Sequence, residues 1–481
     1  MIERSNTNGA GVKLVSAAII PGYAPPKHNT VTIRAIAPVR CEVVIRPDPK
    51  GNRLRFVSSA QQLTQGGRMT NAPSPAKKVV VVGAGFGGLS FIKAMKDPGF
   101  EVTLIDSHNF HTFLPLLYQV ASAGLTAESI AHPARAAIRN RNAKFLLDTV
   151  IDFEFEQNQL LLSSGERIPY DQLVIAAGSV TADFGVKGVA EHTLGMKSID
   201  EALVIRSRVM RALENAARFE NKPVPIVIVG GGPTGVELAG ALAELSRVLH
   251  KDFPELGPAP LRVTLVEAGE LLLPMFPRKL SEIARRDLKR RGVTVLTNAQ
   301  VAEVTKQDVA LKGGRLLDSE LTIWTAGVKG NPLSSLITKR MELISRRDER
   351  VVVDDQLRPA ADKFPNVFVI GDIAAFLDQD QRPLPMVAPV AMQMGRQVAK
   401  FLTDPTSSGF KYRDKGSMAT IGRSDAVVWA KGLRLSGFIA WLAWLGLHLA
   451  YLLGGRNKLQ VVIDWAWNYL TYDRTARQIL R

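Results

Sequence analysis

VVVVGAGFGG, residues 79–88, decides the fold of this 481-residue chain, because a run of β-branched residues leads directly into a glycine-rich turn. A helix-like segment (residues 89–95) and a second strand (residues 101–105) ending in Asp106 follow it. Glycines at these spacings permit a tight turn and a close approach of the backbone to a pyrophosphate, and the terminal acid accepts hydrogen bonds from ribose hydroxyls. The stretch therefore predicts a complete βαβ unit that binds a dinucleotide.

The same pattern returns in PIVIVGGGPTG, residues 225–235, which a helix-like segment and a strand ending in Glu267 follow. This acid comes later than the usual spacing of about 20 residues, because residues 251–260 read as an insertion. A single glycine fingerprint can be no more than a tight strand-to-helix turn. Two complete units in one chain predict two bound dinucleotides.

Charge is concentrated at the two ends of the chain. The formal net charge is +16, of which residues 1–68 and residues 408–481 each carry +7, so the middle of the chain is nearly neutral. Basic residues are not clustered with stacking aromatics, and no nucleic-acid motif occurs. The pattern argues against nucleic acid as a partner and favours an anionic membrane surface for the C-terminal region.

The only cysteine, Cys41, lies outside both nucleotide units. No disulfide can form within the chain. This excludes the flavin disulfide reductases, which pass electrons through a redox-active cysteine pair, and any relay through two thiolates. If a flavin is bound, electrons must leave it directly.

The order of the motifs predicts an α/β fold with two Rossmann-like domains, the second inserted in the first. QLVIAAG (172–178) and LTIWTAG (321–327) end the two modules alike, and NVFVIGD (366–372) reads as the strand that returns to the first domain. The expected division is an N-terminal extension (1–68), a first nucleotide domain (69–198 and 333–407), a second nucleotide domain (199–332) and a C-terminal helical membrane-anchoring region (408–481). We expect the extension, with β-like runs at 31–36 and 41–45, to be disordered or artefactual, with Met69 as the natural start.

The two fingerprints, FLPLLYQVASAGL (113–125), WTAG, VIGD and the C-terminal region together resemble type II NADH dehydrogenases, the single-subunit NADH:quinone oxidoreductases. The resemblance covers about residues 77–481. It implies FAD as cofactor, hydride transfer from NADH to the flavin, and reduction of a membrane quinone (ubiquinone or menaquinone) without proton pumping. Two alternatives stay open: a soluble flavin ferredoxin reductase, and a membrane-associated NADH-binding redox sensor without turnover.

The resemblance assigns the first fingerprint to FAD. It implies these FAD-binding residues: Gly83, Gly85, Phe86, Gly87, Gly88, Asp106, Val150, Ala177, Gly178, Asp372 and Ala388. Asp372 would bind the ribityl chain, although an acid after a buried strand also fits a helix cap. The segment 113–118 fits either core packing or a place beside the isoalloxazine.

The second fingerprint is assigned to NADH, through these residues: Gly230, Gly232, Pro233, Thr234, Gly235, Glu237, Glu267, Ala326 and Gly327. A carboxylate at Glu267 would disfavour the 2′-phosphate of NADPH; the alternative is a solvent-facing charge. Glu237 is expected to be catalytic, because the matching family glutamate lies beside nicotinamide and flavin. Its alternative is a favourable charge in the first helical turn. We expect Glu237→Gln to slow flavin reduction without abolishing FAD binding.

PMVAPVAMQ (385–393) matches the quinone segment of the family, Ala-Gln-x-Ala-x-Gln, except that Pro389 replaces the first Gln. The implied quinone residues are Ala388, Pro389, Met392 and Gln393, with Gln393 as the polar, catalytic candidate. The alternative is that small residues merely start a helix packed on the flavin. No residue pattern predicts a metal site, and His448 is expected to be a polar tip in its helix.

Residues 435–455 are almost entirely apolar and could span a bilayer, since 21 residues of helix reach roughly 31 Å. Residues 459–470 form an amphipathic pattern, with Leu459, Val462, Ile463, Ala466 and Leu470 on one face and Asp464 and Asn468 opposite. Further candidates for the membrane interface are Trp441, Trp444, Trp465, Trp467, Arg434, Arg456, Lys458, Arg474 and Arg477. We expect a homodimer, peripheral or single-span, on the cytoplasmic side of the inner membrane; a helical dimer interface is the alternative use of these segments.

Overall fold

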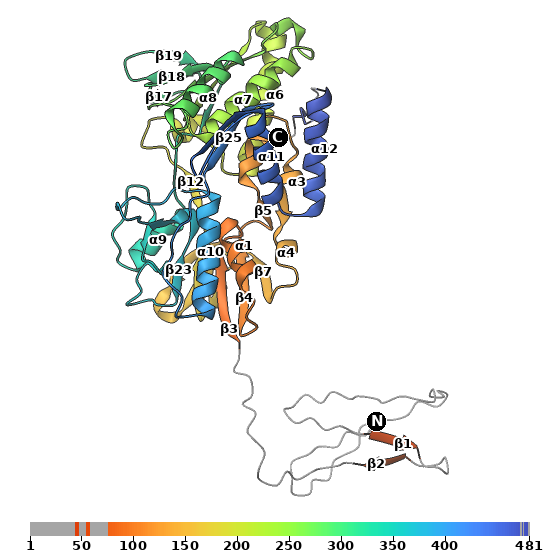
Figure 1. Ribbon diagram of the computed structural model, residues 1–481, viewed down its shortest axis with the longest axis vertical. Coiled ribbons are helices and arrows are strands. Elements are labelled where there is room, and N and C mark those ends of the chain that lie inside the picture. The colour runs from red at the N-terminus through yellow and green to blue at the C-terminus, as the bar shows by residue number, and fades with distance from the viewer. Residues whose placement is uncertain (1–43, 48–53, 58–75, 472–473, 475, 480–481) are drawn as a thin grey trace. The chain divides into compact units, whose positions relative to one another are not determined.

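The computed structural model describes residues 44–47, 54–57, 76–471, 474 and 476–479 (Figure 1). The chain divides into two units, Met1–Pro73 and Ser74–Arg481. In the first unit, β1 (Val44–Pro47) pairs antiparallel with β2 (Leu54–Val57). The expected run at 31–36, the disorder of the extension and the start at Met69 lie outside the described residues.

The first fingerprint lies in a five-stranded parallel sheet with the order β23-β11-β3-β4-β7. Its members are β3 (Lys77–Val82), β4 (Phe100–Asp106), β7 (Ala143–Leu147), β11 (Gln172–Ile175) and β23 (Val367–Val369), and α1 (Phe86–Ala94) follows β3. The four valines of β3 are all buried, as expected for a central strand covered on both faces. Because β23 joins this sheet only after the second fingerprint has passed, the second module is inserted in the first.

The second fingerprint lies in another five-stranded parallel sheet, with the order β13-β20-β14-β15-β16. Its members are β13 (Thr193–Leu194), β14 (Val224–Val229), β15 (Leu261–Val266), β16 (Thr294–Leu296) and β20 (Leu321–Trp324); the helices of this module are α5 (Val189–His192), α6 (Ile199–Asn215), α7 (Pro233–Leu249) and α8 (Arg278–Arg290). Pro233 opens α7, a position at which proline is favoured. The two predicted Rossmann-type sheets are confirmed.

Smaller elements complete the two modules. They are β5 (Phe110–Thr112), β6 (Ala131–Pro133), β8 (Val150–Glu154), β9 (Gln159–Leu162), β10 (Arg167–Pro169), β17 (Val301–Val304), β18 (Asp308–Leu311), β19 (Leu316–Asp318), β22 (Val351–Val353) and β24 (Ala374–Phe376), with the short helices α2 (Leu117–Ala121), α3 (Ala127–Ile130), α4 (Ala134–Ala137) and α9 (Leu333–Arg340). Helical turns are η1 (Leu114–Leu116), η2 (Phe155–Gln157), η3 (Ala216–Glu220), η4 (Pro254–Leu256) and η5 (Gly371–Ile373).

The two modules are joined by a pair of short strands. β12 (Ser179–Thr181) leaves the first module, β21 (Val328–Gly330) returns to it, and the two pair antiparallel. After the return, α10 (Ala388–Thr403) packs against α1 (Figure 1). The helices approach closely at Gly395, where an added Cβ would lie 2.3 Å from the Gly87 carbonyl oxygen. The quinone segment predicted at the start of α10 is thereby held beside the first fingerprint.

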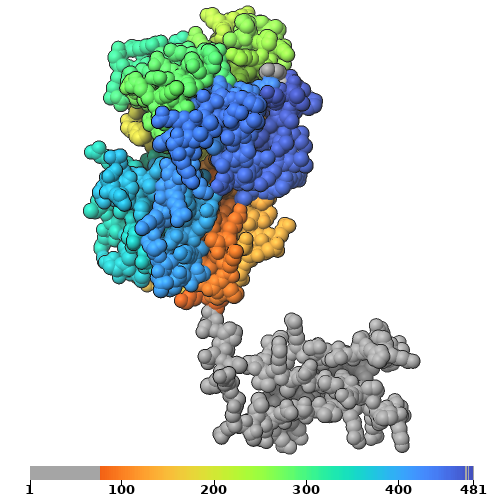
Figure 2. All heavy atoms as spheres, in the orientation of Figure 1, coloured from red at the N-terminus to blue at the C-terminus, as the bar shows by residue number. Residues whose placement is uncertain are grey.

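The C-terminal region is not the long apolar helix that residues 435–455 suggested. Residues 433–437 form β27 (Leu433–Gly437), the edge of an antiparallel sheet with β25 (Ser417–Gly422) and β26 (Asp425–Ala430). The apolar helix α11 (Phe438–Tyr451) is therefore only 14 residues long, and α12 (Gly455–Thr471) follows after a break. Among the described residues, no helix is long and apolar enough to cross a membrane. The C-terminal region lies between the second module and the first in Figure 2.

The second C-terminal helix presents its apolar side to solvent and its polar side to the protein. Leu459, Ile463 and Leu470 are 62%, 57% and 78% exposed. On the opposite side, the Asn457 amide donates to three backbone carbonyls between residues 128 and 131, and the Asn468 amide donates to the Gly124 carbonyl. The predicted amphipathic helix is present, with its polar face, not its apolar face, packed on the first module.

Some residues predicted for the membrane interface are engaged elsewhere. Arg474 is partly buried, donates to the carbonyls of Ser122 and Ala241, and pairs with Glu244, while Arg477 pairs with Asp252. Trp444 is 1% exposed. These side chains attach the C-terminus to the protein and are not available to lipid.

Candidate functional site

The first fingerprint forms a tight loop between β3 and α1. Gly83 has φ +106°, and a Cβ there would lie 2.4 Å from the Ala176 carbonyl oxygen. A Cβ on Gly88 would lie 2.0 Å from the Gly83 carbonyl oxygen, whereas a Cβ on Gly85 would meet nothing within 4 Å. The outer two glycines are thus required by packing. The middle one borders open space at the N-terminus of α1, where a pyrophosphate binds in folds of this kind.

The second fingerprint repeats this loop glycine by glycine. Gly230 has φ +111°, and its Cβ would lie 2.5 Å from the Ala326 backbone. The Cβ of Gly235 would lie 1.9 Å from the Gly230 carbonyl oxygen, and Gly232 again borders open space. Pro233 and Thr234 begin α7 beside it. The two loops therefore have the same shape and offer the same kind of anion site.

Each loop is attached to the acid that ends its second strand. Ala84 N donates to Asp106 Oδ2 at 2.6 Å, and Gly231 N donates to Glu267 Oε2 at 2.6 Å. The second oxygen of Glu267 accepts from Gly269 N at 2.6 Å. Both carboxylates are thereby fixed at the edge where a ribose would lie, and Glu267 is not a freely solvated surface charge.

The turns that end the two modules lie against the two loops. Ala326 is the residue that Gly230 approaches, and Thr325 Oγ1 donates to the Val229 carbonyl at 2.9 Å. Gly327 accepts a backbone hydrogen bond from Ala182. On the first loop, Asn331 holds the corresponding turn, because its Nδ2 donates to the Ala177 carbonyl at 3.2 Å and its N–H donates to the Gly178 carbonyl. The sequence gave no signal for Asn331.

Asp372 follows the return strand and is held by Ser179 of β12 and by Lys197, which precedes α6. Ser179 Oγ donates to Asp372 Oδ2 at 2.8 Å, and Lys197 Nζ donates to Ser179 Oγ at 2.8 Å and lies 3.8 Å from Asp372 Oδ2. Asp372 itself lies within the short helical turn η5 (Gly371–Ile373). This Lys-Ser-Asp group was missed from the sequence because its members lie far apart along the chain.

A series of aromatic rings connects the two fingerprints. Phe86 of the first loop lies 5.8 Å from Phe113, ring centroid to ring centroid, and Phe113 lies 6.2 Å from His448 of α11. His448 stacks on Trp444 at 4.0 Å, and Trp444 contacts Tyr118 at 6.3 Å. The predicted segment 113–118 is therefore core packing that also lies between the two nucleotide loops.

Glu237 lies at the far end of this series, on α7. It is 9% exposed, and Thr420 N donates to its Oε1 at 3.2 Å. Burial raises the pKa of Glu237 to about 8, so the carboxyl holds a proton at neutral pH. A charge favoured by the helix dipole does not describe a buried, protonated carboxyl. Glu237 fits better as a proton-holding group between the two loops.

Two of the residues around Glu237 were named from the sequence, Tyr118 within the segment 113–118 and Trp465 for the membrane interface, but neither was linked to this glutamate. Tyr118 is buried beside it, and burial raises the pKa of this tyrosine, with a smaller contribution from Glu237. Gln119 Nε2 donates to Tyr118 Oη at 2.8 Å, and Trp465 Nε1 donates to Gln119 Oε1 at 2.8 Å. A hydrogen-bonded chain thus leads from Tyr118, beside Glu237, to α12.

The quinone segment is only partly arranged as expected. Ala388 and Pro389 begin α10, and Met392 lines a cavity beside α1. The Gln393 amide, however, exchanges two hydrogen bonds with the backbone of Arg413, each of 3.0 Å. Gln393 therefore anchors the following segment, and its role toward a quinone stays a prediction. Val150 is buried at the start of β8, where only its backbone could reach a ligand.

Comparisons with known proteins agree with this arrangement. A family model described as "Pyridine nucleotide-disulphide oxidoreductase" matches residues 77–395. The Mycobacterium tuberculosis proteins "Type II NADH:quinone oxidoreductase Ndh" and "NdhA" are each 36% identical, over 84% and 86% of this chain and 90% of each relative. The solved structure of NDH2 from Plasmodium falciparum in complex with NADH covers 84% of this chain and 100% of its own, with a TM-score of 0.76. At 21% identity that likeness concerns the fold.

Three observations point to the same family. The chain has two matching nucleotide loops, it has no cysteine pair near either loop, and the relatives align over nearly their whole length. The chain belongs to the type II NADH:quinone oxidoreductases, within the pyridine nucleotide-disulphide oxidoreductase family.

Proposed function

We propose that this protein oxidises NADH and reduces a membrane quinone, with FAD as its resident cofactor: NADH + quinone + H⁺ gives NAD⁺ + quinol. The observation that carries the proposal is the pairing of two equivalent nucleotide loops through a buried aromatic series that ends beside Glu237. Such an arrangement holds two dinucleotides in one molecule. The relatives with this activity align over 84% and 86% of this chain.

The residues of the first loop fit FAD. Gly85 leaves open space at the N-terminus of α1 for a pyrophosphate, and Asp106 is fixed at the ribose position. Asp372, held by Ser179 and Lys197, would accept a hydrogen bond from the ribityl chain. Bound FAD would supply the redox chemistry, taking up a hydride equivalent from NADH and giving two electrons to the quinone.

The second loop would bind NADH. Its Gly232 borders the open pyrophosphate position, and Glu267 is fixed by two backbone N–H groups at the edge that a ribose reaches. A carboxylate there accepts a hydrogen bond from a 2′-hydroxyl and repels a 2′-phosphate. We therefore expect NADH to be preferred to NADPH.

Glu237 would hold one of the protons that the reaction moves. Because burial raises its pKa to about 8, it is protonated at neutral pH and can donate toward the space between the loops. Glu237→Gln keeps the shape and the acceptor for Thr420 but removes the ionisable proton. We expect a several-fold slower reduction of the flavin by NADH with bound FAD unchanged; an unchanged rate of flavin bleaching would remove this role.

We further propose that the protein lies on the membrane surface through α11 and α12. Large apolar side chains are exposed on both helices: Phe438, Ile439, Leu442, Leu447, Leu459, Val462, Ile463, Trp467 and Leu470. Helices with an outward apolar face and an inward polar face favour an interfacial position. The cytoplasmic face of the inner membrane supplies both substrates, and the expected homodimer is to be tested by its mass in detergent.

Steady-state kinetics test the proposed activity. NADH oxidation by the purified protein in detergent is expected to require a quinone, so adding a short-chain quinone should accelerate it strongly. A soluble ferredoxin reductase would respond instead to an iron-sulfur protein, and a redox sensor to neither acceptor. Absence of acceleration by quinone would refute the proposal.

Vesicle flotation tests the membrane position separately. The double variant Ile463→Ser/Leu470→Ser removes two large apolar side chains from the exposed face of α12 without touching its inward polar contacts. It should bind vesicles more weakly than the wild-type protein and keep its activity with a short-chain quinone. Equal binding of both proteins would show that this face is not the docking surface.

A further inference from the structure

A cavity of about 490 Å³ lies beside the first nucleotide loop, between α1, α10 and the end of α11. Phe86, Ser90 and Lys93 line it from α1, and Met392 and Arg396 line it from α10. Tyr451 closes it from α11. The wall formed by Ala450, Tyr451 and Leu453 is thus apolar, whereas α1 and α10 each contribute basic residues next to apolar ones.

The cations of this cavity have no acidic partners. Lys93, Lys96 and Arg396 all line it, no carboxylate does, and among the described residues none of the three makes an ion pair. Two further cations lie at the α11 edge: Lys415 Nζ is 3.4 Å from Tyr451 Oη, and Lys458 Nζ donates to the Ala450 carbonyl at 3.1 Å. Lys93 is partly buried, whereas Lys96 and Arg396 are exposed, and positive charges gathered in this way attract an anion from solution.

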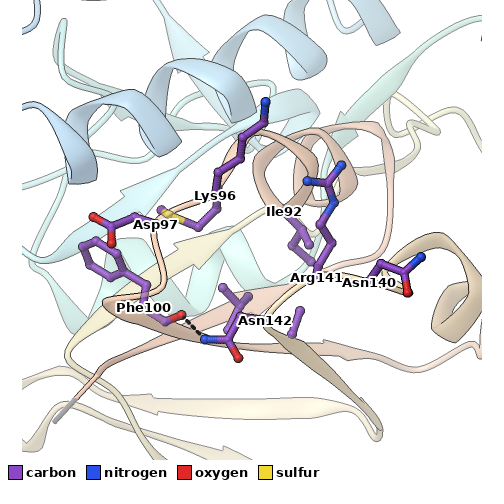
Figure 3. Close-up of a pocket in the computed structure, with 10 residues that line it drawn as sticks. Ile92, Lys96, Asp97, Phe100, Asn140, Arg141 and Asn142 are labelled. Carbon is purple, nitrogen blue, oxygen red and sulfur yellow. Dashed lines mark hydrogen bonds between the residues drawn. The ribbon is translucent and has the colours of Figure 1, made fainter. Parts of the chain in front are cut away.

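The positive region continues past Lys96 into a smaller cavity of about 130 Å³. There Lys96 and Arg141 extend to the same side, while Asp97 points away next to Phe100 (Figure 3). The Asp97 Oδ1 atom accepts from Gly99 N at 2.8 Å, so this carboxylate is already engaged. Burial and the repulsion of Arg141 lower the pKa of Lys93, which shows that the cations affect one another.

The position of the large cavity relates it to the membrane. Ala450 and Tyr451 are exposed residues of α11, the helix whose other exposed residues form the apolar surface described above. A molecule seated in the cavity could therefore continue onto that surface. An uncharged quinone head needs no cluster of cations, whereas a phosphate diester with acyl chains matches both the charge and the apolar wall.

The geometry points to a binding site for the phosphate headgroup of an anionic phospholipid in this cavity, with Lys93, Lys96 and Arg396 on the phosphate and the apolar wall against the acyl chains. The site rests on the membrane association proposed above. A lipid bound there would hold the start of α10, which lies beside the first fingerprint, close to the bilayer. Lys415 and Lys458 would add to the attraction from the rim.

The test compares binding of the full-length protein to phosphatidylcholine vesicles and to vesicles that also contain phosphatidylglycerol. The variant Lys93→Gln/Lys96→Gln/Arg396→Gln should lose at least tenfold of the affinity for the anionic vesicles and little for the neutral ones. The matched control Lys306→Gln/Lys312→Gln/Arg315→Gln removes the same charge from exposed residues on and between the strands β17–β19, and should behave like the wild-type protein.

Each outcome is decisive. If the wild-type protein binds neither kind of vesicle, the membrane association itself fails. If it binds but the triple variant keeps its preference for anionic vesicles, or the control loses it equally, the lipid site is wrong. A raised KM for a short-chain quinone in the triple variant would assign the cavity to quinone instead. Release of the anionic vesicles by inorganic phosphate, but not by sulfate at matched ionic strength, would mark a free phosphate site.

Discussion

The two glycine loops have nearly the same backbone, yet the helices that leave them face different surroundings. Counting from the first glycine, Ser90 and Lys93 on α1 correspond to Glu237 and Gly240 on α7. On α7 this face is covered by β25, which approaches so closely that a Cβ on Gly240 would lie 2.0 Å from the Ile421 carbonyl oxygen. On α1 the same face borders the cationic cavity.

The difference teaches that the glycine loop identifies a dinucleotide site, while the elements that pack on the helix after the loop determine the chemistry of that site. Covering α7 with the C-terminal sheet buries Glu237 and raises its pKa to about 8. Leaving α1 partly uncovered keeps polar and basic side chains accessible near the end of α11.

The largest effect is expected from alanine at the third glycine of each loop. An added Cβ would lie 2.0 Å from the Gly83 carbonyl oxygen in Gly88→Ala and 1.9 Å from the Gly230 carbonyl oxygen in Gly235→Ala. Overpacking of about 1–3 kcal/mol corresponds to about ten- to a hundredfold in affinity. Gly88→Ala should be purified with little FAD, and Gly235→Ala should keep FAD and lose kcat/KM for NADH.

The flavin absorbance of each variant, with steady-state kinetics, separates the two loops. Gly446→Ala is the matched control, because a Cβ there meets nothing within 4 Å and lies far along the chain from both loops. It should leave both properties unchanged. Loss of FAD in Gly235→Ala with retention in Gly88→Ala would reverse the assignment of the two sites.

A smaller effect is expected at the acids that end the second strands. Glu267→Gln removes the charge that repels a 2′-phosphate, and loss of such a charged interaction amounts to about 1.5–3 kcal/mol, so the ratio of kcat/KM for NADH to that for NADPH should fall at least about tenfold. Asp106→Asn, the equivalent change in the first loop, should leave that ratio alone and weaken FAD retention. If Glu267→Gln and Asp106→Asn changed the NADH-to-NADPH ratio equally, the assignment of different ligands to the two loops would be contradicted.

The smallest effect concerns stability and follows from the buried carboxyl that only α7 carries. The pKa of Glu237 is raised from 4.5 to about 8 in the folded protein, so the folded state keeps a proton that the unfolded state has lost between these values. The stability that this carboxyl contributes is therefore present below the unfolded pKa and is lost as pH rises through about 8. The free energy of unfolding changes by at most about 1.4 kcal/mol for each unit by which the pKa is raised.

Glu237→Gln removes this dependence. Its Tm relative to the wild-type protein should rise as the pH increases across that window, whereas Ser90→Ala, at the corresponding position of α1, should give a Tm difference that does not depend on pH. A pH-independent difference for Glu237→Gln would show that the carboxyl is solvated, and would weaken its assignment as a proton-holding group.

Much of the geometry of the two glycine loops was predictable because it depends on local sequence. The spacing of glycines fixes the turn, and the strand before it and the acid after it lie within a short stretch of chain. The partners of the site residues were not predictable in this way. Ser179 and Lys197 reach Asp372, and Thr420 reaches Glu237, across contacts that only the assembled fold creates.

The C-terminal region shows the limit of composition. The apolar run was expected to begin at Leu435, but Leu435 pairs with Val428 in a sheet, and Gly437 at φ +73° ends the strand before α11 begins. The alternation of Leu433 and Leu435 with polar neighbours was the signal for a strand. The amphipathic period of α12 was correctly predicted, whereas its orientation depended on hydrogen bonds made by Asn457 and Asn468 to distant carbonyls.

The absorption spectrum of the purified protein, recorded before and after addition of NADH and then of a quinone, tests the central claim most directly. The account predicts a yellow protein that NADH bleaches without air and that quinone restores to its first spectrum. A protein without flavin absorbance, or one that NADH bleaches and quinone leaves bleached, would contradict it.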